Sequence, residues 1–229
     1  MDRREFFLGA SAGLATMLLG GCAVASQGKV SPEPVVRQTS NVVKRNDKVA
    51  GKKMKITVIT GSPHKDGTSA LLADRFIEGA KTAGHEVFRF NAAFEKVSPC
   101  IGCDRCGMNG PCIYKDSMTQ LNPELFSSDL VAFVTPLYYY GMSAQIKTVI
   151  DRFYANNSRL HERKKAVLMA TAYNSSDWTF NALVEHYKTL VRYMGWEDAG
   201  MVLAGGCGVR SDIERTEFPN QAYKLGLNL

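Results

Sequence analysis

The sequence predicts an α/β fold in which a parallel sheet is covered by helices on both faces. From Met54 onward, short apolar runs rich in β-branched residues alternate with longer amphipathic stretches. Strands that alternate with helices need crossover connections, and these make the strands parallel and bury both faces of the sheet. The segment from Met54 to Leu229 also has the length of one such domain. These observations predict a single three-layer domain.

Five strands are expected, and each comes from a short apolar run. Runs without polar alternation are typical of strands that are covered on both faces. The expected strands are residues 55–60, 86–91, 130–136, 166–173 and 200–205.

Helices are expected between these strands, because apolar residues recur there at intervals of three and four. Pro123 is expected to break the second helix. Gly84 is expected to end the first helix, and Gly195 the fourth. The expected helices are residues 69–84, 118–128, 143–156 and 179–195, with a weak C-terminal helix over 211–218 or after Pro219.

The first 53 residues do not fit this domain and indicate an export leader and a tether. A short charged start precedes an apolar run over residues 6–21, which is too short for a comfortable membrane span. Arg3-Arg4 resembles a twin-arginine leader, and Leu19–Cys22 resembles the lipobox of bacterial lipoproteins. The sequence therefore predicts twin-arginine export to the periplasmic or cell-envelope side and a lipid anchor at Cys22; an ordinary cleaved signal peptide is the alternative. The expected divisions are a signal over 1–22, a flexible tether over 23–53 and a domain over 54–229.

The formal charge of +6 does not indicate a nucleic-acid partner. Residues 1–53 contain nine Lys or Arg and four Asp or Glu, whereas residues 54–229 contain 19 and 18. The excess positive charge therefore belongs to the leader and tether, and the domain lacks the basic balance of a nucleic-acid-binding protein.

The loop after the first expected strand, residues 60–71, has the composition of a phosphate site. Glycine and hydroxyl residues stand where the following helix begins, and backbone N–H groups at a helix N-terminus bind anions. The loop matches neither the dinucleotide-binding fingerprint nor the P-loop. The alternative is a polar turn in which Thr68 or Ser69 is a plain N-cap. The candidate phosphate ligands are Ser62, Gly67, Thr68 and Ser69.

A second loop, residues 135–154, carries three consecutive tyrosines, Tyr138, Tyr139 and Tyr140, ahead of Gly141. Aromatic side chains at a strand end can form walls around a flat aromatic ligand. The alternative is that they cover the edge of the core or a dimer interface.

Four cysteines, Cys100, Cys103, Cys106 and Cys112, form the pattern C-x2-C-x2-C-x5-C within residues 99–112. Short C-x2-C-x2-C runs are typical of iron–sulfur ligands. Zinc sites usually place two C-x-x-C pairs a dozen or more residues apart, so this spacing favours zinc less. Disulfides are a rival because export leads to an oxidising compartment, and free or buried thiols are a further alternative. Cys207 is interpreted as a small residue in a glycine turn.

Three stretches in this order, "GSPHKDGTSALL", "PCIGCDRC" and "PLYYYGMSAQIKTVIDRF", resemble the NADPH-dependent FMN reductase-like branch of the flavodoxin superfamily, which includes iron–sulfur flavoproteins. The resemblance implies a flavodoxin-like sandwich with strand order 2-1-3-4-5 and FMN as cofactor. Lys147, Asp151 and Arg152 match a helix of the family for which a structural role is expected. Two departures are His64, where the family often has Arg or Lys, and "TAYNSSDW", where it is often glycine-rich. The residues implied to bind FMN are Ser62, His64, Gly67, Thr68, Ser69, Pro136, Leu137, Tyr138, Tyr139, Tyr140, Gly141, Tyr173 and Asn174.

The resemblance implies an oxidoreductase in which the chemistry occurs at the flavin and no side chain acts as acid or base. Electrons would pass from NAD(P)H, a quinol or a protein donor to a quinone, a flavin or a redox partner. The four cysteines would hold a [4Fe–4S] cluster, expected at the same edge of the sheet as the FMN. A homodimer or homotetramer is expected, because flavin and cluster commonly come from neighbouring subunits in such relatives. The alternative is a non-catalytic electron carrier or accessory protein in the cell envelope.

Overall fold

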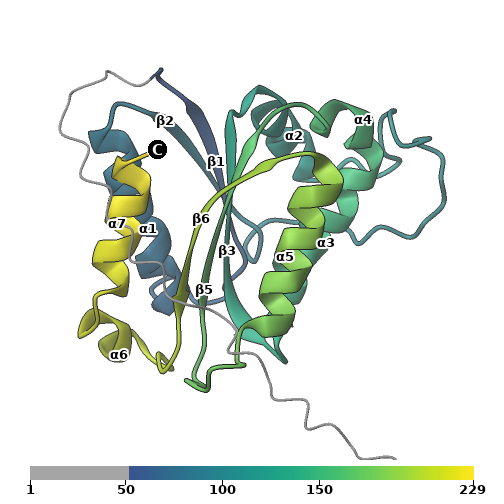
Figure 1. Ribbon diagram of the computed structural model, residues 1–229. Coiled ribbons are helices and arrows are strands. Elements are labelled where there is room, and N and C mark those ends of the chain that lie inside the picture. Colours follow the sequence, from purple (N-terminus) through teal and green to yellow (C-terminus); the bar gives the residue numbers. More distant parts are fainter. Residues whose placement is uncertain (1–51) are drawn as a thin grey trace, which may run out of the picture. The chain divides into compact units, whose positions relative to one another are not determined.

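A parallel sheet of five strands forms the centre of the described residues, 52–229 of this computed structural model (Figure 1). The strand order is β2-β1-β3-β5-β6, with β4 paired antiparallel to the end of β3. Without the two-residue β4, which the sequence did not predict, this is the expected order 2-1-3-4-5. The strands are β1 (Lys55–Thr60), β2 (Glu86–Asn91), β3 (Leu130–Tyr138), β4 (Gly141–Met142), β5 (Lys165–Thr171) and β6 (Glu197–Ala204).

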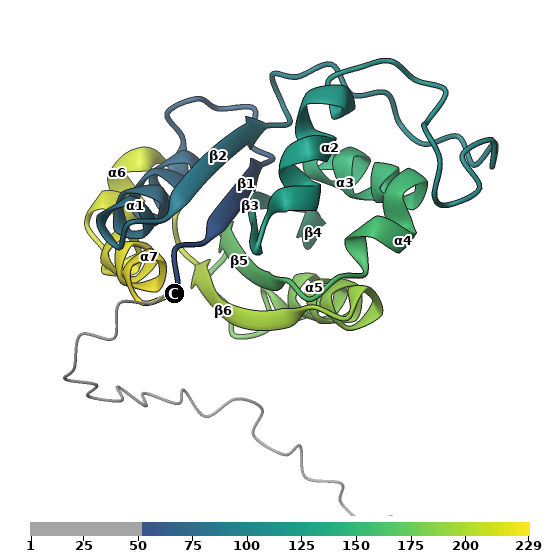
Figure 2. The same cartoon turned by 90° about the horizontal axis from the view of Figure 1, so that it is seen from above.

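Helices cover both faces of the sheet and complete the three expected layers (Figure 2). Each face has its own apolar core, one containing Phe76 of the first helix and the other containing Phe133 of β3. The first layer consists of α1 (Thr68–Thr82), α6 (Arg210–Glu214) and α7 (Phe218–Leu227). The second consists of α2 (Met118–Ser127), α3 (Ala144–Asp151), the 3-10 helix η1 (Arg152–Asn156), α4 (Asn157–Leu160) and α5 (Asn181–Met194).

One expectation about the helices was wrong. Pro123 does not break α2, which continues through it and buries Leu121 and Leu125 on either side. The expected C-terminal helix is present, and both candidate stretches contain one, α6 and α7. Among residues 52–229, no helix has the length and apolar character needed to cross a membrane.

Two glycines bring α1 and α7 into backbone contact. A Cβ atom on Gly226 would lie 2.2 Å from the carbonyl oxygen of Phe76, and one on Gly79 would lie 2.0 Å from that of Tyr223. Such approaches exclude any side chain. The crossing therefore holds the C-terminal helix against α1, the helix whose N-terminus lies at the carboxyl edge of the sheet.

Gly226→Ala is expected to destabilise the domain by about 3 kcal/mol, because overpacking outweighs the gain in helix propensity of about 1 kcal/mol. Urea unfolding of this variant beside Gln221→Ala, an exposed position of the same helix, measures the difference. If Gly226→Ala were as stable as the wild type, the close crossing of α1 and α7 would be wrong.

Candidate functional site

A cleft of about 790 Å³ opens at the carboxyl ends of β1, β3 and β5. This is the edge at which ligands bind in open parallel sheets. The predicted residues that line it are Ser62, His64, Gly67, Thr68, Pro136, Leu137, Tyr138 and Tyr173. The remaining predicted residues, Ser69, Tyr139, Tyr140, Gly141 and Asn174, lie in the same loops but do not line the cleft.

The N-terminus of α1 enters the cleft without a side-chain cap. Its N-cap is Gly67, and no acidic residue lies in the first turn. The hydroxyls of Thr68 and Ser69 instead each lie 2.9 Å from Oγ1 of Thr171, at the end of β5. The alternative in which Thr68 or Ser69 is a plain N-cap is therefore wrong. The first N–H groups of this 15-residue helix are left for an anion.

Positive charge at this end of the cleft comes from Lys65 and Arg210, which both line it. Arg210 belongs to α6 and donates from Nη1 to the carbonyl oxygen of Asp66 at 3.4 Å. It lies more than 140 residues along the chain from the loop, so local sequence reasoning missed it. Arg210 supplies a guanidinium to this loop, in which His64 stands where the family often has Arg or Lys.

The loop is held against the start of α3 at a point where only glycine fits. Ser143 Oγ donates to the carbonyl oxygen of Gly61 at 2.7 Å, and a Cβ atom on Gly61 would lie 2.4 Å from that Oγ. The N–H of Ser143 also donates to Oγ1 of Thr135 at 3.0 Å. Through Ser143, these hydrogen bonds hold the loop after β1 and the loop after β3 together.

Tyr139 and Tyr140 form a strained hairpin turn between β3 and β4. Their φ angles are 46° and 63°, and the flanking residues, Tyr138 and Gly141, pair with each other. A two-residue turn with both φ angles positive normally contains Asn-Gly, and each tyrosine costs about 1–2 kcal/mol in this conformation. Strain of this kind is concentrated at functional sites.

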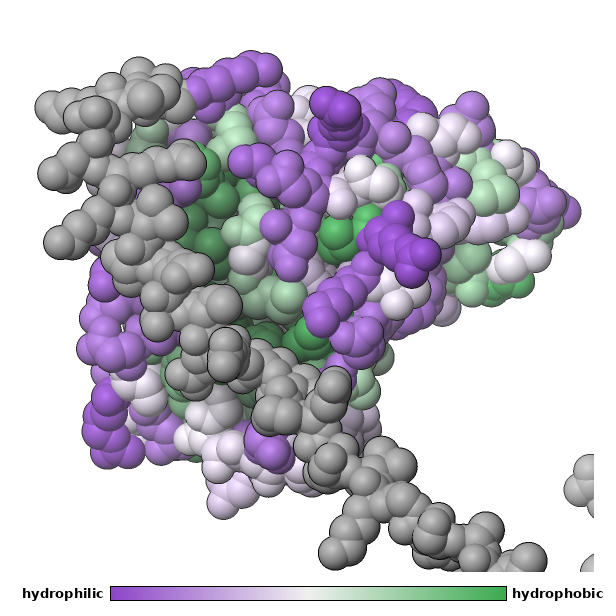
Figure 3. Space-filling view, in the orientation of Figure 1, coloured by the Kyte–Doolittle hydropathy of each residue, from purple (hydrophilic) through white to green (hydrophobic). Residues whose placement is uncertain are grey.

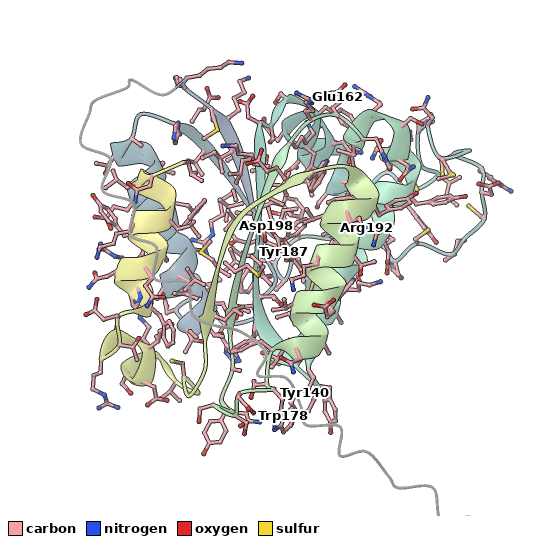
Figure 4. The ribbon with its side chains drawn as sticks, in the orientation of Figure 1. Tyr140, Glu162, Trp178, Tyr187, Arg192 and Asp198 are labelled. Carbon is pink, nitrogen blue, oxygen red and sulfur yellow. The ribbon has the colours of Figure 1, made fainter. Side chains whose placement is uncertain are left out.

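The tyrosines do not cover the core, as one alternative supposed. Tyr139 is fully exposed, and the ring of Tyr140 stacks obliquely on Trp178, with 5.0 Å between the centroids (Figure 4). Trp178 comes from the loop between β5 and α5, which also carries the exposed Tyr173. Trp178 was not among the predicted site residues; the available signal was an aromatic residue in the stretch "TAYNSSDW", where the family is often glycine-rich.

The four cysteines of the predicted cluster site line a second, smaller cavity. Cys100, Cys103, Cys106 and Cys112 are all free thiols, which does not support the disulfide alternative. Among residues 52–229, no group of three or more His, Cys, Asp or Glu side chains is arranged to hold a single metal ion.

The backbone around the thiols repeatedly enters the left-handed region. Positive φ angles occur at Gly102 (64°), Asp104 (55°), Gly107 (53°) and Met108 (61°). Mixed right- and left-handed backbone directs successive N–H groups inward, and such concave nests occur at many iron–sulfur sites. The loop thus has the backbone of an anion or cluster cradle.

A buried ion pair closes the neck of this loop. Arg152 Nη1 donates to the carbonyl oxygen of Ser98 at 2.7 Å and to Asp116 Oδ2 at 2.6 Å. Asp116 also accepts the N–H groups of Ser98 at 2.9 Å and Met118 at 3.1 Å. Burial alone would raise the pKa of Asp116, but the hydrogen bonds from Arg152 and from these two N–H groups outweigh it and hold the pKa below its ordinary value. Arg152, for which the resemblance implied a structural role at a helix end or a dimer contact, thus ties together the two ends of the cysteine loop.

The neck is expected to loosen in acid. Because the pKa of Asp116 is lowered by folding, its stabilising contribution is present above the ordinary value of 3.8 and is lost as the pH falls through the lowered pKa. Hydrogen exchange over residues 98–116, corrected for intrinsic rates, should show this loss of protection below about pH 3.8. Asp116→Asn should abolish the pH dependence; an unchanged acid transition in that variant would contradict the assignment.

The cysteine loop does not lie beside the cleft of its own chain, contrary to expectation. Its cavity is lined by Arg152, Tyr154 and Ala155 at the far end of α3 and η1, whereas Ser143 at the near end contacts the cleft loop. The helix between Ser143 and Arg152 is about 13 Å long. The two cavities share no lining residue, and the loop projects away from the sheet (Figures 1 and 3). The contacts with η1 turn it there, including the hydroxyl of Tyr154, which donates to Asp104 Oδ1 at 2.8 Å.

The predicted leader, tether and lipidated Cys22 lie outside the described residues.

Known proteins resemble the chain over most of the domain. A model of the family described as NADPH-dependent FMN reductase matches residues 54–201. An iron-sulfur flavoprotein from Archaeoglobus fulgidus is 35% identical over 99 residues, covering 43% of this chain and 45% of the relative. An iron-sulfur flavoprotein from Clostridioides difficile is 32% identical over 130 residues, covering 53% and 56%. The chain spans about half the length of the curated relatives that it matches.

Solved structures agree on the fold. An NAD(P)H:quinone oxidoreductase from Methanothermobacter marburgensis superposes with a TM-score of 0.62 over 77% of this chain and 96% of that one, at 18% identity. An azoreductase from Bacillus anthracis gives 0.59 over 77% and 100%, at 14% identity. Identities this low establish the flavodoxin-like architecture and nothing finer. With the family match, they show that the chain is a flavodoxin-like member of the NADPH-dependent FMN reductase family.

Proposed function

We propose that the chain is an exported FMN-dependent oxidoreductase that passes electrons from a reduced donor to a quinone, a flavin or a redox protein. The observation that carries this proposal is the cleft itself. One end presents an uncapped helix N-terminus with two cations, and the rest of the lining includes Tyr138 at the end of β3 and Tyr173 after β5, with the Tyr139-Tyr140 turn next to Tyr138. A phosphate at one end and a flat ring at the other are the two parts of FMN.

The residues fit this cofactor. The N–H groups at the start of α1 would bind the phosphate, with Arg210 and Lys65 supplying charge, and Thr171 keeps the Thr68 and Ser69 hydroxyls in place. Pro136 to Gly141 would border the ring, with Tyr173 and Asn174 opposite. Bound FMN supplies hydride and single-electron transfer. The chain's own task is to orient the ring and keep water from one side of it, so no side chain is assigned as acid or base.

Exchange of Tyr139-Tyr140 for Asn-Gly should separate stability from function. The turn would lose its strain, and the free energy of unfolding should rise by about 1–3 kcal/mol. The aromatic wall would be lost as well, so turnover with a quinone should fall. Urea unfolding and quinone kinetics on the same preparation measure both changes. A variant with unchanged quinone kinetics would remove the hairpin from the site.

We propose that Cys100, Cys103, Cys106 and Cys112 hold a [4Fe–4S] cluster. Three features support it: the four cysteines line one cavity, the backbone forms a nest, and similar chains from Archaeoglobus and Clostridioides are named iron-sulfur flavoproteins. Because the loop points away from its own cleft, we propose a homodimer or homotetramer in which it approaches the cleft of a neighbour.

We propose export by the twin-arginine route and lipid attachment at Cys22, so that the domain works at the cell envelope on a tether. The Arg3-Arg4 pair and the Leu19–Cys22 lipobox support this placement. NAD(P)H is scarce outside the cytoplasm, which favours a quinol or a protein as donor.

Steady-state assays of the full-length chain test the function. With FMN bound, a quinol or NAD(P)H should support repeated reduction of a quinone or free flavin. A protein that is reduced once but shows no repeated turnover with any of these donors and acceptors would be a carrier, and the enzymatic proposal would fail.

A further inference from the structure

Arg152 binds the neck of the cysteine loop, and it also lines the cavity that the four cysteines line. Its side chain is 2% exposed and that of its partner Asp116 is 5% exposed. The guanidinium lies 5.2 Å from the ring centroid of Tyr114, which leaves the loop two residues after Cys112. Ser98 enters the loop two residues before Cys100 and gives its carbonyl oxygen to the same guanidinium.

The ion pair is oriented with respect to the thiols. Arg152 lines the thiol cavity, whereas Asp116 does not. The positive member of the pair is therefore the nearer one, and the negative member lies behind it at the start of α2. No second acidic side chain pairs with Arg152 among residues 52–229.

A buried ion pair is not needed merely to hold the two ends of the cysteine loop together. Taking two charges out of water is costly, and well-packed apolar side chains often replace a buried ion pair with no loss of stability. A cluster held by four thiolates, however, carries negative charge, and its reduction potential depends on nearby charge and hydrogen bonds. A buried cation on the cavity wall favours the reduced, more negative state.

We propose that Arg152 is the positioning residue of the thiol site: it closes the cysteine loop before any cluster binds, and its charge raises the reduction potential of the cluster. The second half rests on the proposed function, in which the four cysteines hold a [4Fe–4S] cluster. The first half concerns the polypeptide alone.

The positioning role is tested on the cluster-free, full-length chain by hydrogen exchange over residues 98–116. Arg152→Gln and Asp116→Asn should each accelerate exchange on the order of 100-fold, because each leaves a buried partner unpaired. Arg152→Lys should recover part of the protection. Lys147→Gln, which breaks the exposed pair with Asp151 on the same helical segment, is the matched control and should change nothing. Wild-type protection in Arg152→Gln would overturn the positioning role.

The electrostatic effect of Arg152 is tested by measuring the midpoint potential of the reconstituted cluster. Arg152→Gln should lower it, and Asp116→Asn, which leaves the cation uncompensated, should raise it. Loosening of the loop alone would move both variants in the same direction, and that result would overturn the electrostatic role. FMN affinity should be unchanged in all variants, which confirms that the domain is folded. If the wild type takes up no iron or sulfide, the proposed cluster fails and the electrostatic half with it, whereas the exchange experiment still decides the positioning half.

Discussion

Gly67→Asp is expected to lower the affinity for FMN by a factor on the order of 100 or more, without destabilising α1. Gly67 is the N-cap of α1, and its backbone is extended (φ −77°, ψ −176°), so aspartate fits the conformation. A Cβ atom there would lie 3.0 Å from the Cβ of His64, an exposed loop residue that must shift by a few tenths of an ångström. Aspartate is among the best N-caps and glycine is only slightly worse, so the helix should gain roughly a few tenths of a kcal/mol.

The same carboxylate would oppose the cofactor in two ways. It would accept the N–H groups that the phosphate needs, and it would place a negative charge beside the phosphate. Like charges about 4 Å apart near a protein surface repel by roughly 4 kcal/mol. Titration of FMN against the apoprotein measures the loss, and urea unfolding checks the helix.

Gly67→Asn is the matched control, because asparagine has the shape and capping ability of aspartate without its charge. It should bind FMN at least roughly tenfold more tightly than Gly67→Asp. Wild-type affinity in Gly67→Asp would mean that the phosphate does not bind at the N-terminus of α1.

Cys103→Ser is expected to remove the proposed iron–sulfur cluster and leave FMN bound. Cys103 lies in the middle of the left-handed part of the loop, between Gly102 and Asp104, and lines the thiol cavity. Serine keeps the size of the side chain but is a poor ligand for iron. Because the two cavities share no lining residue, the flavin content should stay at the wild-type level.

Iron and sulfide analysis after anaerobic purification measures this effect, beside the visible spectrum. Cys207→Ser is the control: this buried thiol belongs to the wall of the flavin cleft, and its loss should leave the iron content intact. Full iron and sulfide in Cys103→Ser would remove Cys103 from the ligand set.

The sheet and its layers could be predicted because they depend on patterns that are local in the sequence. Buried apolar runs such as residues 55–60 and 130–136 became β1 and β3, and the helical periods between them became the covering layers. The β4 hairpin escaped prediction because it is only two residues long and its turn contains tyrosines in place of the usual Asn-Gly. The α1–α7 crossing depends on Gly79 and Gly226, whose proximity no local pattern reveals.

The site was predictable where a loop directly follows a strand, and it was missed where the fold brings distant segments together. Ser62, Gly67, Thr68 and Tyr138 were found in this way, and the family resemblance added His64 and Leu137. Thr171, Arg210 and Trp178 reach the same edge from later strands and helices, so only the topology unites them with the first loop. The direction of the cysteine loop was wrong for the same reason, since its contacts with Arg152 and Tyr154 determine where it lies.

The central claim is that the cleft at the carboxyl edge of the sheet is an FMN site. The most direct measurement is the flavin content of the full-length chain purified anaerobically, followed by titration of any empty protein with FMN. The account predicts a yellow protein that releases FMN equimolar to the chain, or an apoprotein that takes up that amount. A colourless protein that binds no added FMN would contradict it.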